Sequence, residues 1–254
     1  IPMVNHSGHM INDPVLIKLD QDRYWVSISD SDALLWVTGI AHTLKFDVKI
    51  FEPDISPIAV QGPKAVELMM RVIGSNIEEL PFFGIRAFNF IGTKLYISRS
   101  GYSKQGGFEI YANSKKISHD LWHSLFEAGR DLDVRPGGPN LIERIESGLL
   151  SYGNDITIEN TPFECGLGKF LPSVIKSECI GSKSLNHKHL RQPKQIIKCI
   201  AVEGSDLPAC TEPWPLLSGG RNVGQITSAA YSPDFNVTVA LGMINTNFSK
   251  PETA

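Results

Sequence analysis

The sequence predicts an α+β fold, with antiparallel sheets and packed helices followed by a small C-terminal β-barrel. Two observations lead to this prediction. Short apolar or alternating runs recur in pairs around turn residues, as in β-hairpins, and helical periods lie between these pairs. From about residue 195 the helical periods stop, and short strands separated by Gly, Pro and Asn take over.

Hairpins and helices are predicted to alternate through the first part of the chain. The strands are expected at residues 15–19, 24–28, 47–52, 55–61, 87–90, 95–99 and 108–111. The helices are expected at residues 33–41, 64–73, 116–129 and 140–150. Residues 29–32 supply Ser and Asp side chains suited to cap the first helix. Trp25, Trp36 and Trp122 occupy apolar positions and are expected in the core.

A polar, broken stretch at residues 151–194 is expected to connect the two modules. Strands of the second module are expected at residues 196–202, 222–227 and 237–244. The domain prediction is therefore a first region over residues 1–194 and a β-barrel module over residues 195–254. Ile1 is not a start methionine, and no closing element precedes the last residue. We therefore expect a slice of a longer protein, truncated at both ends.

Composition excludes several classes of function. The net charge is -3 and basic residues do not cluster, which argues against a nucleic-acid partner. No run approaches the roughly 18 apolar residues of a membrane span, so no membrane partner is expected. The four cysteines lack CxxC spacing, which argues against a zinc site and a disulfide scaffold. We expect a cytoplasmic protein without a bound metal.

The turn and strand at residues 99–111 are the most informative part of the chain. Three glycines lie in a polar turn that runs into an alternating strand. Glu109 and Tyr111 share one face of that strand, and Phe108 and Ile110 share the other. A carboxylate beside a phenol suits a flat, hydrogen-bonding ligand, although an ordinary hairpin can carry the same short pattern.

Several segments in a fixed order resemble one family. They are residues 8–14, 99–111, 141–155, 161–168, 180–185 and 220–228. In order and spacing they resemble the aminomethyltransferase (glycine-cleavage T-protein) superfamily of tetrahydrofolate enzymes, over nearly the whole chain. Within it, residues 10–15, 99–111 and 139–148 are most similar to the dimethylsulfoniopropionate demethylases.

The resemblance implies a tetrahydrofolate site. Glu109 would accept hydrogen bonds from the amino group and ring N–H of the pterin. Tyr102 and Tyr111 would supply aromatic surface or a hydroxyl beside it. Arg144 would face the ligand cleft or form a structural salt bridge. In T-proteins, an arginine four residues before this position contacts folate. In this chain that position is Asn140.

The resemblance also implies a catalytic element at Asn12 and Asp13. T-proteins carry two consecutive aspartates there, so the first has become a neutral amide in this chain. Moving a methyl group from a sulfonium to a folate nitrogen is a direct displacement that releases a neutral thioether and needs no proton. A neutral Asn12 fits that chemistry, and Asp13 would then orient the pterin or contribute to the electrostatic field of the site. The alternative is that Asn12, Asp13 and Pro14 merely shape a turn.

The resemblance therefore implies a tetrahydrofolate-dependent methyltransferase that demethylates dimethylsulfoniopropionate. The products would be methyltetrahydrofolate and a methylthiopropionate, with tetrahydrofolate as methyl acceptor and a homodimer as the assembly to be tested. One alternative is a glycine-cleavage aminomethyltransferase. Another is a non-catalytic folate-binding protein, although the lysine-glycine-cysteine signature of such members is absent.

Overall fold

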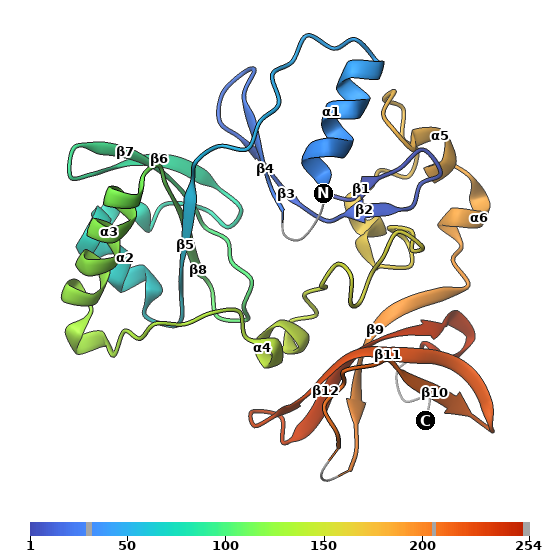
Figure 1. Cartoon of the computed structure of the whole chain (residues 1–254). Coiled ribbons are helices and arrows are strands. Elements are labelled where there is room, and N and C mark those ends of the chain that lie inside the picture. Colours follow the sequence, from blue (N-terminus) through green and yellow to red (C-terminus); the bar gives the residue numbers. More distant parts are fainter. Residues whose placement is uncertain (29–31, 205–206, 251–254) are drawn as a thin grey trace. The chain divides into compact units, whose positions relative to one another are not determined.

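The computed structural model describes residues 1–28, 32–204 and 207–250 (Figure 1). The chain forms two compact units. The split unit combines residues 1–48 with residues 145–254, and the central unit holds residues 49–144. Each unit is described by itself below.

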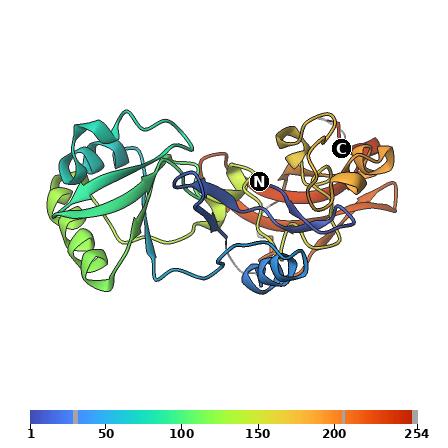
Figure 2. The same ribbon diagram turned by 90° about the horizontal axis from the view of Figure 1, so that it is seen from above.

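A four-stranded antiparallel sheet forms the centre of the central unit, in the order β5-β8-β7-β6. The strands are β5 (Ser56–Gln61), β6 (Ile85–Phe90), β7 (Thr93–Ser98) and β8 (Gly107–Ala112). The helices are α2 (Ala65–Ile73) and α3 (Lys115–Ala128), with single turns η1 (Ser75–Ile77) and η2 (Arg130–Leu132). Both helices lie along one face of the sheet (Figures 1 and 2). The core of the unit lies between these helices and the sheet. Its fully buried side chains include Phe108, Ile110, Met69 and Leu121.

The bounds of α3 follow from its capping residues. The Ser114 hydroxyl accepts a hydrogen bond from the backbone N–H of Ile117 at 3.3 Å, and Gly129 ends the helix. Leu121 and Leu125 fill the inward face. The prediction that Trp122 lies in the core is wrong, because Leu121 already takes that face and Trp122 is 42% exposed.

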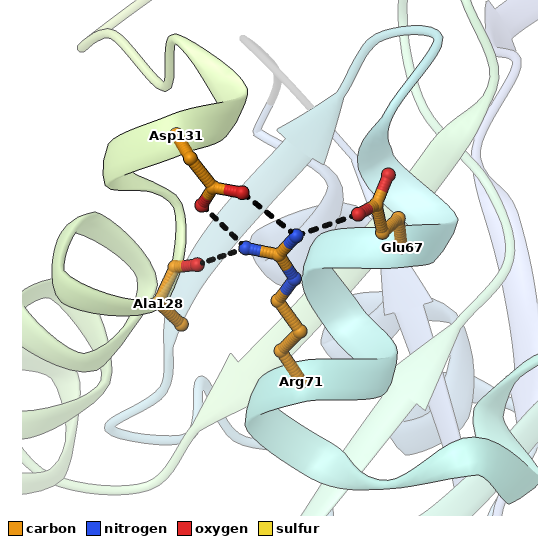
Figure 3. A network of polar contacts seen from close by, with 4 residues as sticks. All are labelled: Glu67, Arg71, Ala128 and Asp131. Atoms are coloured by element: carbon orange, nitrogen blue, oxygen red, sulfur yellow. Dashed lines mark hydrogen bonds and ion pairs between the residues drawn. The ribbon is translucent and has the colours of Figure 1, made fainter.

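Arg71 joins the two helices of the central unit (Figure 3). Its guanidinium donates to Asp131 at 2.5 and 3.0 Å, to Glu67 at 2.6 Å and to the backbone oxygen of Ala128 at 2.8 Å. Ala128 is the last residue of α3, so Arg71 satisfies a carbonyl that the helix itself leaves open. The hydrogen bond from Arg71 lowers the pKa of Asp131.

The split unit begins with two short hairpins and a helix. These are β1 (Met3–Val4) with β2 (Met10–Asn12), β3 (Val15–Lys18) with β4 (Tyr24–Ser27), and α1 (Ala33–Thr43). After α4 (Leu141–Glu146), short helical pieces follow at η3 (Leu167–Phe170), α5 (Ser182–Leu185) and α6 (Lys188–Arg191). Met10, Ile156, Cys165 and Leu185 form a buried cluster. The stretch predicted as a connection therefore contributes core residues.

The C-terminal part of the split unit is an antiparallel sheet in the order β10-β11-β12-β9. Its elements are β9 (Gln195–Val202), β10 (Trp214–Ser218), β11 (Arg221–Ser232), β12 (Val237–Asn245) and η4 (Thr246–Phe248). The sequence prediction missed β10. This strand contains Pro215 and lies at the edge of the sheet, where a missing backbone N–H is tolerated.

Three local predictions need correction. Residues 47–52 are irregular, and no described strand pairs with that run. The helix predicted at 140–150 is only α4, because Gly148 adopts the left-handed conformation (φ +66°) that ends it. Asp32 precedes α1 without a capping hydrogen bond to the described helix, and the other predicted capping residues, 29–31, lie outside the described residues.

Asp155 ties the segment after α4 to the C-terminal sheet. Its Oδ1 accepts hydrogen bonds from the hydroxyls of Thr227 at 2.7 Å and Ser228 at 2.6 Å, and its Oδ2 accepts from the backbone N–H of Ser151 at 2.9 Å. Adjacent residues of a regular strand point to opposite faces, but the register of β11 shifts between Ile226 and Ser228. That bulge lets both hydroxyls reach one buried carboxylate.

Asp155→Ala is expected to destabilise the chain by about 2–4 kcal/mol, because the buried Ser228 hydroxyl, the half-buried Thr227 hydroxyl and a backbone N–H lose this acceptor. The measurement is the free energy of unfolding in urea, followed by circular dichroism. Glu159→Ala, an exposed carboxylate in the same segment, is the matched control and should change little. Equal stability of the two variants would contradict the structural role given to Asp155.

In the part of the chain that the structure describes, every helix falls short of the length and hydropathy of a membrane span.

Candidate functional site

Glu109 lies on β8, on the face of the sheet opposite α2 and α3. Its neighbours Phe108 and Ile110 are fully buried under those helices, which confirms the predicted alternation. Ser100 donates a hydrogen bond from its hydroxyl to Oε2 of Glu109. The hydroxyl of Ser98, the cross-strand neighbour of Glu109 on β7, lies 2.6 Å from the Ser100 hydroxyl. Two buried hydroxyls in series therefore orient the half-buried carboxylate.

The glycine-rich turn before β8 is held by Gln61, the last residue of β5. The side-chain amide of Gln61 donates to the backbone oxygens of Ser100 at 3.0 Å and Phe108 at 3.2 Å. Its carbonyl oxygen accepts from the Ser103 hydroxyl at 3.0 Å. A Cβ atom on Gly101 would overlap the amide group of Gln61, so this close approach requires glycine. The turn is consequently pre-organised.

The same turn is also linked to α4. Gln105 donates from its side-chain amide to Glu143 Oε1 at 2.9 Å. Asn140 caps α4, because its side-chain oxygen accepts from the backbone N–H groups of Ile142 at 3.0 Å and Glu143 at 3.3 Å. The residue that replaces the expected folate-contacting arginine therefore has a structural role in starting this helix.

The two tyrosines and Arg144 differ in their exposure. Tyr111 shares the Glu109 face of β8 and is 6% exposed, whereas Tyr102 in the turn is 41% exposed. Arg144 on α4 is 5% exposed. Glu109, Tyr102, Tyr111 and Arg144 all belong to the central unit. Their role in ligand binding stays a prediction.

Asn12 and Asp13 belong to the split unit, at the end of β2. Asn12 is 3% exposed, and its side-chain oxygen accepts from the backbone N–H of Asp13 at 2.8 Å. The backbone N–H of Met10 donates to the backbone oxygen of Asn160 at 2.8 Å, which fixes β2 to the segment after α4. Burial is the largest cause that raises the pKa of Asp13. The catalytic role of both residues stays a prediction.

Cys165 lies in the buried cluster of the same unit. Burial, aided by the nearby charges of Glu164 and Asp13, raises the pKa of the Cys165 thiol to about 12. A protonated, buried thiol of this kind has a packing role and is a poor nucleophile. Among the described residues, no group of three or more His, Cys, Asp or Glu side chains is placed to hold a metal ion.

Sequence reasoning missed the residues that support Glu109. Ser98 and Ser100 lie near Glu109 in sequence, and their alternation on either side of Arg99 was a usable signal. Gln61 left no local signal, because its strand pairs with β8 only through the tertiary fold. The pairing of Asp155 with Thr227 and Ser228 spans more than 70 residues and was equally hidden.

The class that emerges is an α+β protein with a central antiparallel unit, a carboxylate held on the sheet face opposite its helices, and a C-terminal barrel-like sheet. Two family models match the chain. The GCVT N-terminal domain matches residues 1–173, and the glycine cleavage T-protein C-terminal barrel domain matches residues 194–254. The chain belongs to the aminomethyltransferase (glycine cleavage T-protein) family.

Two relatives are similar to the chain over nearly its whole length, and one solved structure shares its fold. It is 50% identical to the dimethylsulfoniopropionate demethylase DmdA of Ruegeria pomeroyi, over 100% of this chain and 69% of the relative. It is 29% identical to an aminomethyltransferase of Clostridium botulinum, over 98% and 68% of the two chains. The crystal structure of the glycine cleavage system aminomethyltransferase T from Bartonella henselae superposes with a TM-score of 0.80 at 22% identity, covering 99% and 69%. That superposition supports the fold.

Asp13→Asn is expected to stabilise the protein at neutral pH. Burial raises the pKa of Asp13 in the folded state. At pH values above the unfolded pKa of about 3.9, the ionised side chain therefore lowers the free energy of unfolding. Below about pH 4 the carboxyl is protonated in both states, so the gain from the substitution should vanish there. Urea midpoints across pH 3.5–8 measure this difference.

Asp22→Asn is the matched control for this measurement, since Asp22 is exposed in the turn between β3 and β4. A pH-independent difference, or a loss of stability in Asp13→Asn at pH 7, would contradict the assigned cost of burying Asp13.

Proposed function

We propose that this protein is a tetrahydrofolate-dependent methyltransferase that demethylates dimethylsulfoniopropionate, yielding methyltetrahydrofolate and methylthiopropionate. The observation that carries the proposal is the 50% identity over the full chain to a dimethylsulfoniopropionate demethylase. Identity to the aminomethyltransferase relative is 29% over a similar span. A difference of this size favours the demethylase branch of a shared family.

The environment of Glu109 fits a pterin. The pterin edge offers an amino group and a ring N–H as adjacent donors, which a carboxylate matches with its two oxygens. The Ser100 hydroxyl donates its hydrogen bond to Oε2. Within the described part of the chain, this leaves Oε1 to accept a hydrogen bond from a ligand. Glu109 would thus bind and orient the pterin with little rearrangement, because its hydroxyl partners already hold it.

The residues around Glu109 would complete the binding surface. Tetrahydrofolate supplies the nitrogen nucleophile that accepts the methyl group. Tyr102, exposed in the pre-organised turn, is proposed to contribute aromatic surface to the pterin. Tyr111 is proposed to border the same face of β8 through its ring, and Arg144 to assist from α4.

Asn12 and Asp13 are proposed as the catalytic element of the split unit. Methyl displacement from a sulfonium leaves a neutral thioether, so the site has no proton to supply to the leaving group. A buried neutral amide at Asn12 suits this requirement. Burial makes ionised Asp13 costly in the free protein, and a neighbouring sulfonium cation would offset that cost.

Several sequence-based expectations stay proposals. They are the cytoplasmic location, a place in sulfur and one-carbon metabolism, a homodimeric assembly, and the domain division at residues 194 and 195. The absence of a bound metal from the reaction is also kept as a proposal.

A product analysis with two donors tests the proposed function. The protein is incubated with tetrahydrofolate and either dimethylsulfoniopropionate or the aminomethyl-loaded carrier protein of the glycine cleavage system. Methyltetrahydrofolate formed from the sulfonium alone is expected. Methylenetetrahydrofolate formed from the carrier would instead assign the chain to the aminomethyltransferases. Folate binding without either product would leave a binding protein.

Glu109→Ala is expected to weaken tetrahydrofolate binding by about 10- to 100-fold, the value of one or two hydrogen bonds to a charged group. Isothermal titration calorimetry measures the dissociation constant. Ser100→Ala should weaken binding less, because it loosens the carboxylate without removing it. Glu79→Ala, an exposed carboxylate of the same unit, is the matched control. An unchanged dissociation constant in Glu109→Ala would overturn the assignment.

A further inference from the structure

His119 and His123 form a close pair on the outer surface of α3. They are four residues apart, so they lie one above the other on one side of the helix. The two Nε2 atoms are 3.1 Å apart, and the ring centroids are 4.3 Å apart in an edge-to-face arrangement. Both side chains are exposed. The pair lies on the helix side of the central sheet and is separate from the Glu109 face.

The nitrogen separation matches the geometry of metal chelation. Imidazole nitrogens bind divalent transition metals at about 2.0–2.1 Å. Two such bonds from atoms 3.1 Å apart meet at an angle of about 100°, which lies between octahedral and tetrahedral values. Without an ion, one ring donates its Nε2–H to the other ring. The two nitrogens are therefore already at the separation that a chelated ion needs.

The surroundings of the pair leave room for the other ligands of a bound ion. Asp120, the residue after His119, forms an ion pair with Lys116 at 2.8 Å. His123 also lines a surface groove of about 470 Å³ between α2, α3 and the β6–β7 turn. The groove gives water access to the coordination positions that the two histidines leave open.

We propose that His119 and His123 form a two-histidine site for a divalent transition metal ion of the kind that prefers imidazole, such as Ni²⁺ or Zn²⁺. Water molecules complete the coordination sphere, since the described residues offer no third protein ligand of the usual kind. The bound ion links successive turns of α3. Because the unfolded chain does not hold the two rings together, binding stabilises the folded central unit.

The second histidine pair of the chain supplies a control. His187 and His189 are two residues apart at α6, and their ring centroids are 5.6 Å apart at an interplanar angle of 31°. Residues two apart on a helix do not face each other. This pair has the same composition as the first one without its chelating geometry.

The test is Ni²⁺ binding by isothermal titration calorimetry, with untagged protein and buffer free of chelators. Wild-type protein is expected to bind one Ni²⁺ ion, and His119→Gln or His123→Gln to bind it more than tenfold more weakly. Glutamine keeps a good helix propensity, so α3 should persist in both variants. The double variant His187→Gln/His189→Gln should bind like wild type.

Thermal unfolding gives a second readout. Saturating Ni²⁺ should raise the unfolding temperature of wild type and of the His187→Gln/His189→Gln variant, but leave that of the α3 variants unchanged. Equal Ni²⁺ affinity in wild type and the α3 variants would overturn the proposal. So would a loss of affinity confined to the His187 and His189 variant.

Discussion

The central unit depends on the burial of Phe108 and Ile110 on one face of β8. Each apolar side chain of this size contributes about 1.5–3 kcal/mol when fully buried. Strand alternation is strict, so a slip of one residue would carry Glu109 into the core and expose the apolar pair. The hydrophobic core thereby fixes the direction of the one carboxylate on which the proposed pterin site rests.

The polar contacts around Glu109 refine that direction. Ser98, Ser100 and Gln61 come from two strands and a turn, and together they fix the carboxylate and the backbone that leads to it. Each of these groups is satisfied within the unit. A site built in this way needs little reordering when a ligand binds. Little of the binding free energy is therefore lost to ordering side chains.

The split unit is held together differently, since residues 49–144 separate its two parts in sequence. Asp155 shows how one buried carboxylate joins a connecting segment to the C-terminal sheet, with a β-bulge presenting two hydroxyls to it. Asn12 is the last residue of the short β2 strand of the same unit, and Asp13 follows it. Burial keeps the neutral amide of Asn12 in place and raises the pKa of the neighbouring Asp13 carboxyl, and the proposed role of both in methyl transfer rests on this pairing.

The sequence by itself determined the fold class, most hairpins, α2 and α3, and the face of β8 that carries Glu109. These features follow from hydrophobic period and capping residues, which act over a few neighbouring positions. The order and spacing of the motifs also sufficed to indicate the family. Tertiary structure decided what local pattern leaves open. It left residues 47–52 without a partner strand, ended α4 at Gly148, and paired β10 at an edge. It also brought Gln61 to the turn before β8 and Asp155 to β11, because such contacts depend on which distant segments meet.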